Sequence, residues 1–273
     1  RSILIAQFFL ILSASLAGAP SMPMQDTTYL DEVTVQAYFA DQPLLRLTAS
    51  AGVIGRQVLD QQSGTSLLPA LNTVPGVRMK ERSLRSYRLS LRGGLLRSPF
   101  GVRNVKVYLD ELPLTDAGGN TYFNLLDAGG IDRLEVLKGP DGSLFGANSG
   151  GVVIVRPNGM ADEAHPGGQF QLHGGSFGLF QEQLSASLQL SPAYRFNVSQ
   201  SFQRSDGYRQ QSAMRRTTLQ TVQRWQYRPT TELRLIALYT DLRYETPGGL
   251  TAAQYAENPR LARPATPTVP GAV

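Results

Sequence analysis

The sequence contains no cysteine and only two histidines, His165 and His173. Within this chain, the lack of cysteine excludes disulfides, thiolate-ligated zinc, iron–sulfur clusters and thiol catalysis. Two histidines are also too few for a histidine-built metal site, so we expect no metal ligands. Charged residues make up 17% of the chain, below the roughly 25% of a typical soluble domain.

Long apolar runs are also scarce, because the only one lies in residues 1–19. That run is too short for a spanning helix with polar flanks, and small residues follow it. This pattern predicts a secretory signal peptide with its charged start missing; the alternative is a buried N-terminal helix. The remaining chain is long enough for a sizeable core, and 41% hydrophobic residues exclude a disordered tail.

Basic residues are concentrated in one segment. Residues 78–103 contain eight basic residues and one acidic residue, a local net charge of +7. Such a charge implies an anionic partner or carboxylates elsewhere in the fold. A nucleic acid, an anionic small molecule and an internal ion-pair partner are therefore the three explanations to test.

Two regions with different patterns follow a polar segment at residues 20–29. Residues 31–37 alternate apolar and polar side chains, which predicts an extended arm able to pair with another sheet edge. Residues 50–156 then combine short helices and strands, so we expect a small mixed α/β domain. Its expected helices are residues 57–61 and 66–72, and its expected strands are residues 104–109, 131–138 and 151–155.

Beyond about residue 167 the pattern changes to long strands with period-two alternation. One face of residues 180–190 is apolar, and the other is rich in Gln and Ser. Similar segments follow at residues 194–202, 217–227 and 232–244, joined by alternately short and long connections. This pattern is typical of transmembrane β-hairpins, and a soluble antiparallel sandwich is the alternative. About five strands are too few to close a barrel around a domain, so we expect the first part of a larger barrel.

Several motifs occur in an order that resembles the TonB-dependent outer-membrane receptors. Residues 31–37 are similar to the family's TonB box, which would consist of Asp31, Glu32, Val33, Thr34, Val35, Gln36 and Ala37. Motifs similar to those of the family's plug domain occupy residues 66–77, 89–94, 107–113, 131–140, 143–146 and 150–153. Glu111 departs from the family pattern, which has glycine in that hairpin, and would be strained at a positive φ. Lys138 and Phe145 are milder departures.

The resemblance implies an α+β plug domain followed by the first strands of a large, incomplete antiparallel transmembrane β-barrel. The implied divisions are a signal peptide at residues 1–19, a linker with the TonB box at 20–43, the plug at 44–159 and barrel strands at 160–273. The short distance between the signal peptide and the box also implies that no extra signalling domain lies between them.

The implied function is TonB-dependent import of a ferric chelate, either a siderophore or ferric citrate, into the cell through the outer membrane. Its partners would be TonB, outer-membrane lipid and the chelate. It would use no cofactor and catalyse no reaction. The alternatives are a soluble or fragmentary ligand-binding module without transport, and a receptor for a vitamin or sugar.

Two sets of site residues follow from the resemblance. The plug loops expected to meet the ligand would contribute Arg97, Ser98, Phe100, Arg103, Asn120 and Tyr122, although ordinary loop packing is the simpler explanation. A lock between plug and barrel would use Arg92, Glu135 and Lys138; solvated surface charges are the alternative there.

Two other functions have little support in the sequence. Residues 174–178 fit the hydrolase pattern G-x-S-x-G, but a strand pattern follows where that motif needs a helix, and no histidine occurs later. The basic segment contains a single Arg-Gly-Gly without repeats or interleaved aromatic residues. The expected signal peptide also predicts export from the cytoplasm. We therefore expect neither an enzyme nor a nucleic-acid-binding protein.

Overall fold

The computed structural model describes residues 34–37, 40–47, 49–62, 64–81, 87–94, 102–139, 144–146, 150–160, 167–265 and 271–272. The expected signal peptide, and Asp31, Glu32 and Val33 of the expected TonB box, lie outside these residues. Within the described ranges, no helix is long and apolar enough to cross a membrane.

The N-terminal part of the described chain is a mixed α/β domain, as expected. Its helices are η1 (Leu44–Arg46), α2 (Arg56–Gln61), α3 (Leu68–Leu71), η2 (Phe123–Leu125) and η3 (Ala128–Gly130). Its strands are β1 (Thr34–Ala37), β2 (Ala40–Pro43), β3 (Ser50–Ile54), β4 (Val77–Glu81), β5 (Tyr87–Leu91), β6 (Lys106–Leu109), β7 (Leu112–Pro113), β8 (Ile131–Lys138) and β9 (Gly151–Pro157). A five-stranded sheet in the order β3-β8-β9-β6-β7 forms its centre, and only β6 and β9 pair in parallel.

Apolar side chains on both faces of this sheet explain why its central strands are buried. On one face, Leu134 and Val136 of β8 join Val153 and Val155 of β9 in the larger core. On the other face, Leu137, Val152 and Ile154 belong to a smaller core. Neither face is open to water, which is why residues 151–155 form a continuous apolar run.

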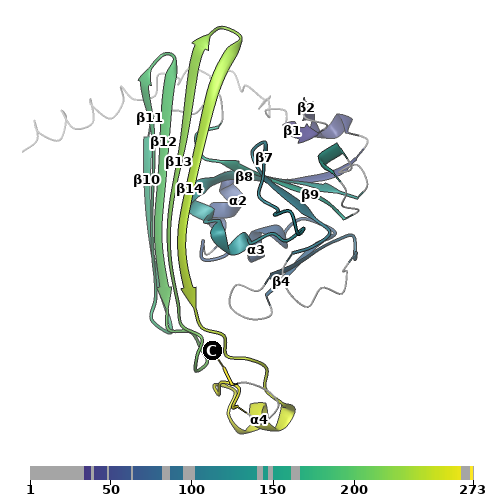
Figure 1. The fold of residues 1–273 in the computed structure, drawn as a ribbon, viewed down its shortest axis with the longest axis vertical. Helices are drawn as coiled ribbons and strands as arrows, with labels where there is room; N and C mark the ends of the chain where they lie inside the picture. Colours follow the sequence, from purple (N-terminus) through teal and green to yellow (C-terminus); the bar gives the residue numbers. More distant parts are fainter. Residues whose placement is uncertain are drawn as a thin grey trace, which may run out of the picture. The chain divides into compact units, whose positions relative to one another are not determined.

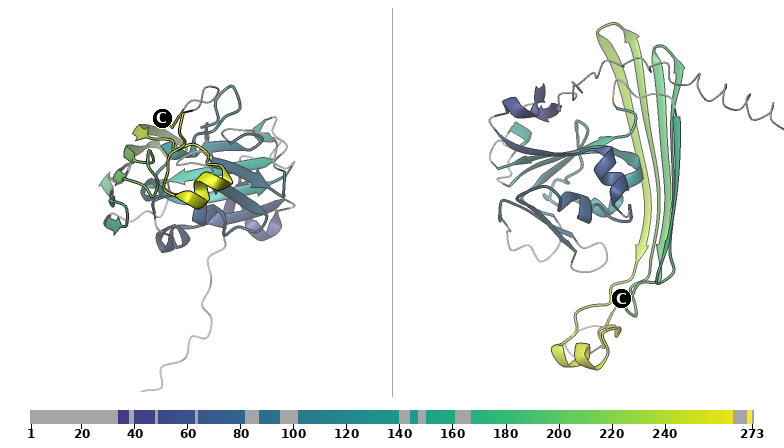
Figure 2. Two further views of the ribbon diagram at one scale, coloured as in Figure 1. Left: turned by 90° about the horizontal axis from the view of Figure 1, so that it is seen from below. Right: turned by 180° about the vertical axis from the view of Figure 1, so that it is seen from behind.

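The C-terminal part contains five long antiparallel strands that follow one another in chain order (Figure 1). They are β10 (Gly167–Gly175), β11 (Leu179–Ser191), β12 (Tyr194–Ser205), β13 (Met214–Arg228) and β14 (Thr231–Tyr244). Figure 2 shows these strands as one layer, and shows α4 (Ala252–Glu257) past the end of β14. The five strands leave no closed barrel, which confirms the expected partial architecture.

The long sheet has two chemically different faces, because side chains alternate along each strand. We call the face that contacts the α/β domain inward, and it carries buried polar residues such as Gln181, Gln183 and Gln220. The outward face carries exposed apolar residues, including Leu184 and Leu188. This is the alternation expected from the sequence.

In the hairpin between β6 and β7, the positive φ does not fall on Glu111. Among its two loop residues, Asp110 adopts the left-handed conformation with φ 54°, whereas Glu111 has no positive φ. Asp tolerates this conformation better than most residues. The backbone N–H of Asp110 also donates to the Val155 carbonyl at 2.8 Å. The turn conformation therefore differs from the one that would strain Glu111, and the positive φ falls on Asp110 instead.

Candidate functional site

Asp127 is the centre of the contact between the α/β domain and the long strands. It caps η3 by accepting from the Gly129 N–H at 2.9 Å. The same oxygen accepts from Gln183 Nε2 of β11 at 2.6 Å, and the other oxygen pairs with Arg216 Nη2 of β13 at 2.5 Å. Arg216 also donates to the Leu126 carbonyl at 2.9 Å. A buried ion pair is stable only when its remaining hydrogen-bonding groups are satisfied, and these contacts supply several of the bonds it needs.

Further polar side chains of the inward face donate to backbone carbonyls of the α/β domain. Gln220 Nε2 donates to Gly130 O at 2.7 Å, and Thr240 Oγ1 donates to Leu125 O at 2.9 Å. Gln181 Nε2 donates to Gly64 O at 3.1 Å. Most of these carbonyls lie in residues 125–130, so hydrogen bonds attach this one segment of the domain to β11, β13 and β14.

Glycine is needed where this segment meets the strands. A Cβ atom on Gly129 would lie 3.0 Å from the Gln183 side chain, and one on Gly130 would lie 3.2 Å from that of Gln220. Both distances are shorter than normal contacts. The two glycines therefore allow the backbone of η3 to approach the inward face closely enough for hydrogen bonding.

A second set of contacts lies at the opposite ends of the strands. Arg234 Nη1 of β14 lies 3.4 Å from a carboxylate oxygen of Asp110 and 3.4 Å from one of Glu111. Arg156 of β9 forms a second ion pair with Asp110. Arg224 Nη1 donates to the Met160 carbonyl at 2.8 Å. The β6–β7 hairpin is thus attached to the inward face near the short turns.

The three residues expected to lock plug and barrel lie in the α/β domain. Glu135 is fully buried and accepts from Arg133 Nε at 2.9 Å and Arg156 Nε at 3.2 Å. Lys138 Nζ donates to the Pro75 carbonyl at 3.0 Å. Arg92 is exposed and has φ 52°. These hydrogen bonds are internal to the domain, so a direct lock by these residues stays a prediction.

A carboxyl group next to this network has an altered acidity. Burial raises the pKa of Asp132 on β8, although the nearby Arg133 and Arg56 oppose that rise. The arginines therefore do not fully compensate the loss of hydration around this carboxyl group.

The structure brings together some of the expected ligand residues. Arg103 Nε donates to Asn120 Oδ1 at 2.8 Å, and the neighbouring residues Val102 and Thr121 form an isolated β-bridge. Tyr122 follows directly, with half of its surface exposed. Arg97, Ser98 and Phe100 lie outside the described residues. Two loops far apart in sequence therefore share one exposed polar patch.

The described half of the expected TonB box is not a free arm. Thr34–Ala37 form β1 and pair with β2 in an antiparallel hairpin. Val35 is fully buried in the smaller core with Leu137 and Ile154. The expected free strand is therefore wrong for these residues, because an apolar side chain and a neighbouring strand within the chain provide a local docking site.

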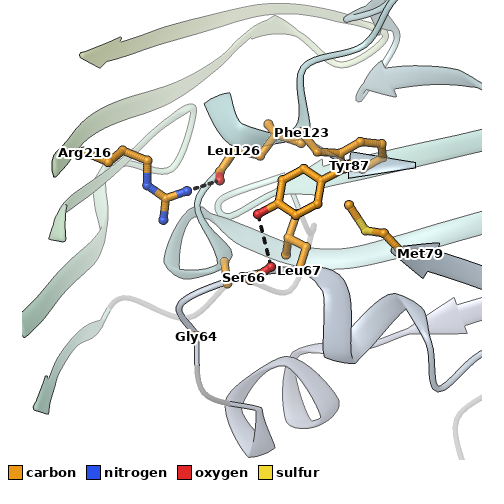
Figure 3. A pocket seen from close by; sticks show the side chains of 9 residues that line it. Gly64, Ser66, Leu67, Met79, Tyr87, Phe123, Leu126 and Arg216 are labelled. Carbon is orange, nitrogen blue, oxygen red and sulfur yellow. Dashed lines mark hydrogen bonds between the residues drawn. The ribbon is translucent and has the colours of Figure 1, made fainter. Parts of the chain in front are cut away.

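The cavity next to Arg216 is small (Figure 3). Tyr87, Met79, Phe123 and Leu126 are among the residues that line it, and the Ser66 and Tyr87 hydroxyl groups lie 3.3 Å apart at its edge. Its volume of about 10 Å³ is enough for about one water molecule. Among the described residues, no group of three or more His, Cys, Asp or Glu side chains could hold a metal ion.

Sequence reasoning missed the residues that join the two parts. The alternation in residues 180–190 identified Gln181 and Gln183 as inward-facing, but it did not identify Asp127 as a partner. A usable signal was present, because Asp127 precedes Ala128, Gly129 and Gly130 as a helix N-cap would. The distance in sequence hid the pairing with Arg216.

Comparison with protein families and curated proteins gives a consistent result. Residues 43–153 match the model of the TonB-dependent Receptor Plug Domain family. The chain is 27% identical over 200 residues to a vitamin B12 transporter, BtuB, of Vibrio vulnificus, covering 72% of this chain and 32% of that protein. It is 33% identical over 131 residues to a ferrioxamine receptor of Yersinia enterocolitica, covering 46% of this chain and 18% of that protein. The chain thus spans a third or less of these relatives.

A solved structure shares the fold. The unliganded ferric citrate transporter FecA is similar with a TM-score of 0.66 and 19% sequence identity. The match covers 80% of this chain and 35% of that one. At this identity the likeness concerns the fold, and it includes both the α/β domain and the strands that follow.

Proposed function

We propose that the whole protein imports a ferric chelate through the outer membrane, with energy supplied by TonB. The premise is that residues 43–153 match the TonB-dependent receptor plug domain. The observation that carries this proposal is the two-faced sheet. Its polar face holds the plug through Asp127, Arg216 and Gln220, while its other face is apolar. A plug inside a lipid-embedded barrel needs this combination.

The positions of the plug contacts support a ligand site at one end of the strands. Residues 206–213 and those after Tyr244 form the longer connections, which face the outside in barrels of this kind. Thr240 and Arg216, near that end, hold the segment around Leu125 and Leu126. Asn120 lies shortly before this segment in the chain, and its pair with Arg103 is exposed; on this proposal the pair faces ligand entering from outside.

The chemistry of this patch favours an anionic ligand. Arg103 has a fixed positive charge, and the segment from residue 78 to 103 has a net charge of +7. Positive charge above low-dielectric walls attracts an anionic chelate. Similarity to a ferrioxamine receptor and to a ferric citrate transporter is consistent with iron uptake. Similarity to a vitamin B12 transporter makes cobalamin the competing substrate.

Uptake by whole cells tests the proposal. The complete receptor would be expressed in cells that lack their own ferric-chelate and cobalamin receptors, with and without TonB. We expect accumulation of labelled ferric citrate, an anionic chelate, only when TonB is present. Accumulation of ferrioxamine alone, whose iron–hydroxamate centre has no net negative charge, would support iron import but not the anionic ligand. Accumulation of cyanocobalamin alone would replace the iron substrate, and ligand binding without TonB-dependent accumulation would favour a binding module. On this proposal the protein is a transporter that needs no cofactor, not an enzyme.

A further inference from the structure

Three arginines lie side by side on the outward face of the long sheet. Arg204 of β12 is directly opposite Arg215 of β13, and Arg215 is directly opposite Arg243 of β14. All three are exposed, and they alternate with inward-facing residues such as Arg216. We call these three residues the outward arginine row. Like charges directly opposite each other on neighbouring strands are destabilising, so the row needs a compensating charge.

The described part of the chain supplies little negative charge to this row. Arg243 Nε lies 3.9 Å from Asp241 Oδ1, and both side chains are largely exposed. Glu182 is directly opposite Phe202, which is the next outward-facing residue of β12 after Arg204, counted away from the long connections. Among the described residues, Arg204 and Arg215 form no ion pair within 4.0 Å. Two carboxylates therefore lie near three guanidinium groups, and only one pairs with any of them.

An inward row of three arginines shows how the protein neutralises such a group when it does so itself. Arg195 is opposite Arg224, and Arg224 is opposite Arg234. Glu232 accepts from Arg224 Nη2 at 2.8 Å and from Arg234 Nε at 2.6 Å. Asp110 contacts Arg234 as well. The inward row is thus surrounded by carboxylates, whereas the outward arginine row faces away from the protein.

Aromatic rings support two of the outward guanidinium groups. Arg204 lies over the Phe180 ring at 5.9 Å, and Arg215 lies over the Phe202 ring at 5.2 Å. Such stacking restrains the planar group by one face and leaves its edge N–H groups available. The row is therefore partly arranged for an oxyanion before any ligand binds.

The location of the row specifies the kind of anion. It lies at the end of the strands that carries the longer connections. On the same outward face, counted from the row toward the middle of the strands, the second residues are the exposed Leu184 on β11 and Leu219 on β13. Tyr239 of β14 lies opposite Leu219. An apolar surface directly beside a row of arginines fits a molecule with acyl chains and a phosphate group. A free phosphate ion would use the charges but not the apolar surface.

We infer that the outward arginine row binds the phosphate groups of a lipid in the outer leaflet of the membrane; this rests on the proposed function, because it places this face in lipid. Guanidinium groups bind phosphate oxygens through paired, charge-assisted hydrogen bonds. A lipid phosphate would remove the repulsion between the three arginines and fix the height of the strands in the membrane.

Lipid binding to the purified complete receptor in neutral detergent tests the inference. The probes are diphosphorylated lipid A, dephosphorylated lipid A and inorganic phosphate, with binding measured by native mass spectrometry. We expect tight binding of diphosphorylated lipid A only, weakened about fivefold by Arg215→Gln. Combining this change with Arg204→Gln and Arg243→Gln should weaken binding more than about tenfold, because hydrogen bonds to charged groups are lost.

Arg228→Gln is the matched control, because Arg228 is an exposed arginine near the other end of β13 and also lies over a ring, that of Tyr227, at 5.9 Å. It should leave lipid A binding unchanged. Equal binding to the triple variant, equal binding of dephosphorylated lipid A, or full competition by inorganic phosphate would each overturn the inference.

Membrane fractionation and ferric-chelate uptake by the same variants separate this inference from the proposed function. The triple variant should still fractionate with the outer membrane and import its ligand. A wild-type receptor outside the outer membrane would overturn the proposed function and this inference together. A correctly placed, importing receptor whose lipid A binding does not depend on the row would contradict the inference alone.

Discussion

Asp127 and Arg216 lie 89 residues apart in the chain, yet their side chains form a buried pair between plug and strands. Both side chains are at most 3% exposed. Removal of one partner from such a pair leaves an unpaired buried charge, which costs far more than an exposed ion pair contributes. This pair is therefore the best single point at which to detach the plug.

We predict that Arg216→Gln destabilises the docked plug by about 3–5 kcal/mol, the usual cost of breaking a buried pair. Asp127 would retain its bonds from Gly129 and Gln183 but lose its counter-charge. Increased protease sensitivity of the plug in the complete receptor is the measurement. Thr217→Ala, on the opposite face of the same strand, is the control. Equal sensitivity of the two variants would contradict the prediction.

A different readout applies to the residues expected to meet the ligand. We predict that Arg97→Ala and Arg103→Ala weaken binding of a ferric chelate without releasing the plug, because Arg103 pairs only with the loop residue Asn120 among its described side-chain contacts. Arg92→Ala should loosen the plug with a smaller effect on affinity. Equilibrium binding of labelled ferric citrate to whole cells and protease sensitivity are measured in parallel. Unchanged affinity in both loop variants would remove the argument for an anionic ligand.

At the scale of elements, the β1–β2 hairpin raises the question of how a TonB box could reach its partner. A strand recognised by edge pairing must have free N–H and C=O groups. In this structure, one edge of β1 is paired with β2 and Val35 is buried beneath. Among the described residues, the other edge of β1 has no strand partner. If TonB binds this segment as a strand drawn out of the domain, or through the edge that β2 occupies, β1 must separate from β2.

A reversible crosslink tests this requirement, and these 273 residues contain no cysteine that could compete for the disulfide. Val35 and Gln42 are directly opposite each other in the hairpin, at a separation suited to a disulfide. We predict that Val35→Cys combined with Gln42→Cys blocks TonB-dependent uptake when oxidised and restores it on reduction. Either single variant is the control. Normal uptake with a confirmed disulfide would show that Thr34–Ala37 need not be released.

Elements with a strict local pattern could be predicted from sequence, and those that depend on distant partners could not. The alternation of Leu184, Ala186 and Leu188 with polar residues predicted β11, because an apolar face and a polar face on one strand leave a period of two in the sequence. By contrast, β10 is bounded by glycines that weaken its pattern. The pairing of β1 with β2 depends on the core beneath Val35, which no local pattern reveals.

The same distinction applies to the candidate site. Arg103 and Asn120 were predicted as ligand residues in two separate loops. The structure shows that they contact each other, and their contact with a ligand stays a prediction. Asp127 was missed, because an N-cap, a glutamine on β11 and an arginine on β13 converge only in the folded molecule. Long-range polar contacts of this kind carry no periodic signal in the sequence.

For the whole molecule, the main question is which side of the long sheet faces lipid. The inward face carries side chains that bind the plug, and the outward face carries an apolar band with Trp225 and Leu233 near one end. The outward arginine row lies near the other end. Along the strands, the outward face thus passes from the aromatic Trp225 through the apolar band to the arginine row. This order matches the profile of a bilayer from one interface to the other.

A pair of adjacent substitutions tests this arrangement. Leu188 is exposed on the outward face, and Gln189 next to it points to the other face. We predict that Leu188→Arg lowers the free energy of unfolding in lipid bilayers by about 1–3 kcal/mol. Leu188 lies one same-face position inside the Trp225 row, and the cost of an outward arginine falls from about 2–4 kcal/mol at the midplane to about 0–1 kcal/mol near an interface. Gln189→Arg should cost less, because the inward face is polar and does not contact lipid. Repulsion from Arg195, its cross-strand neighbour, adds no more than about 1 kcal/mol. Urea unfolding of the complete receptor in vesicles measures both changes. Since the two residues share a strand and differ only in the face they occupy, equal costs would mean that this face does not contact lipid.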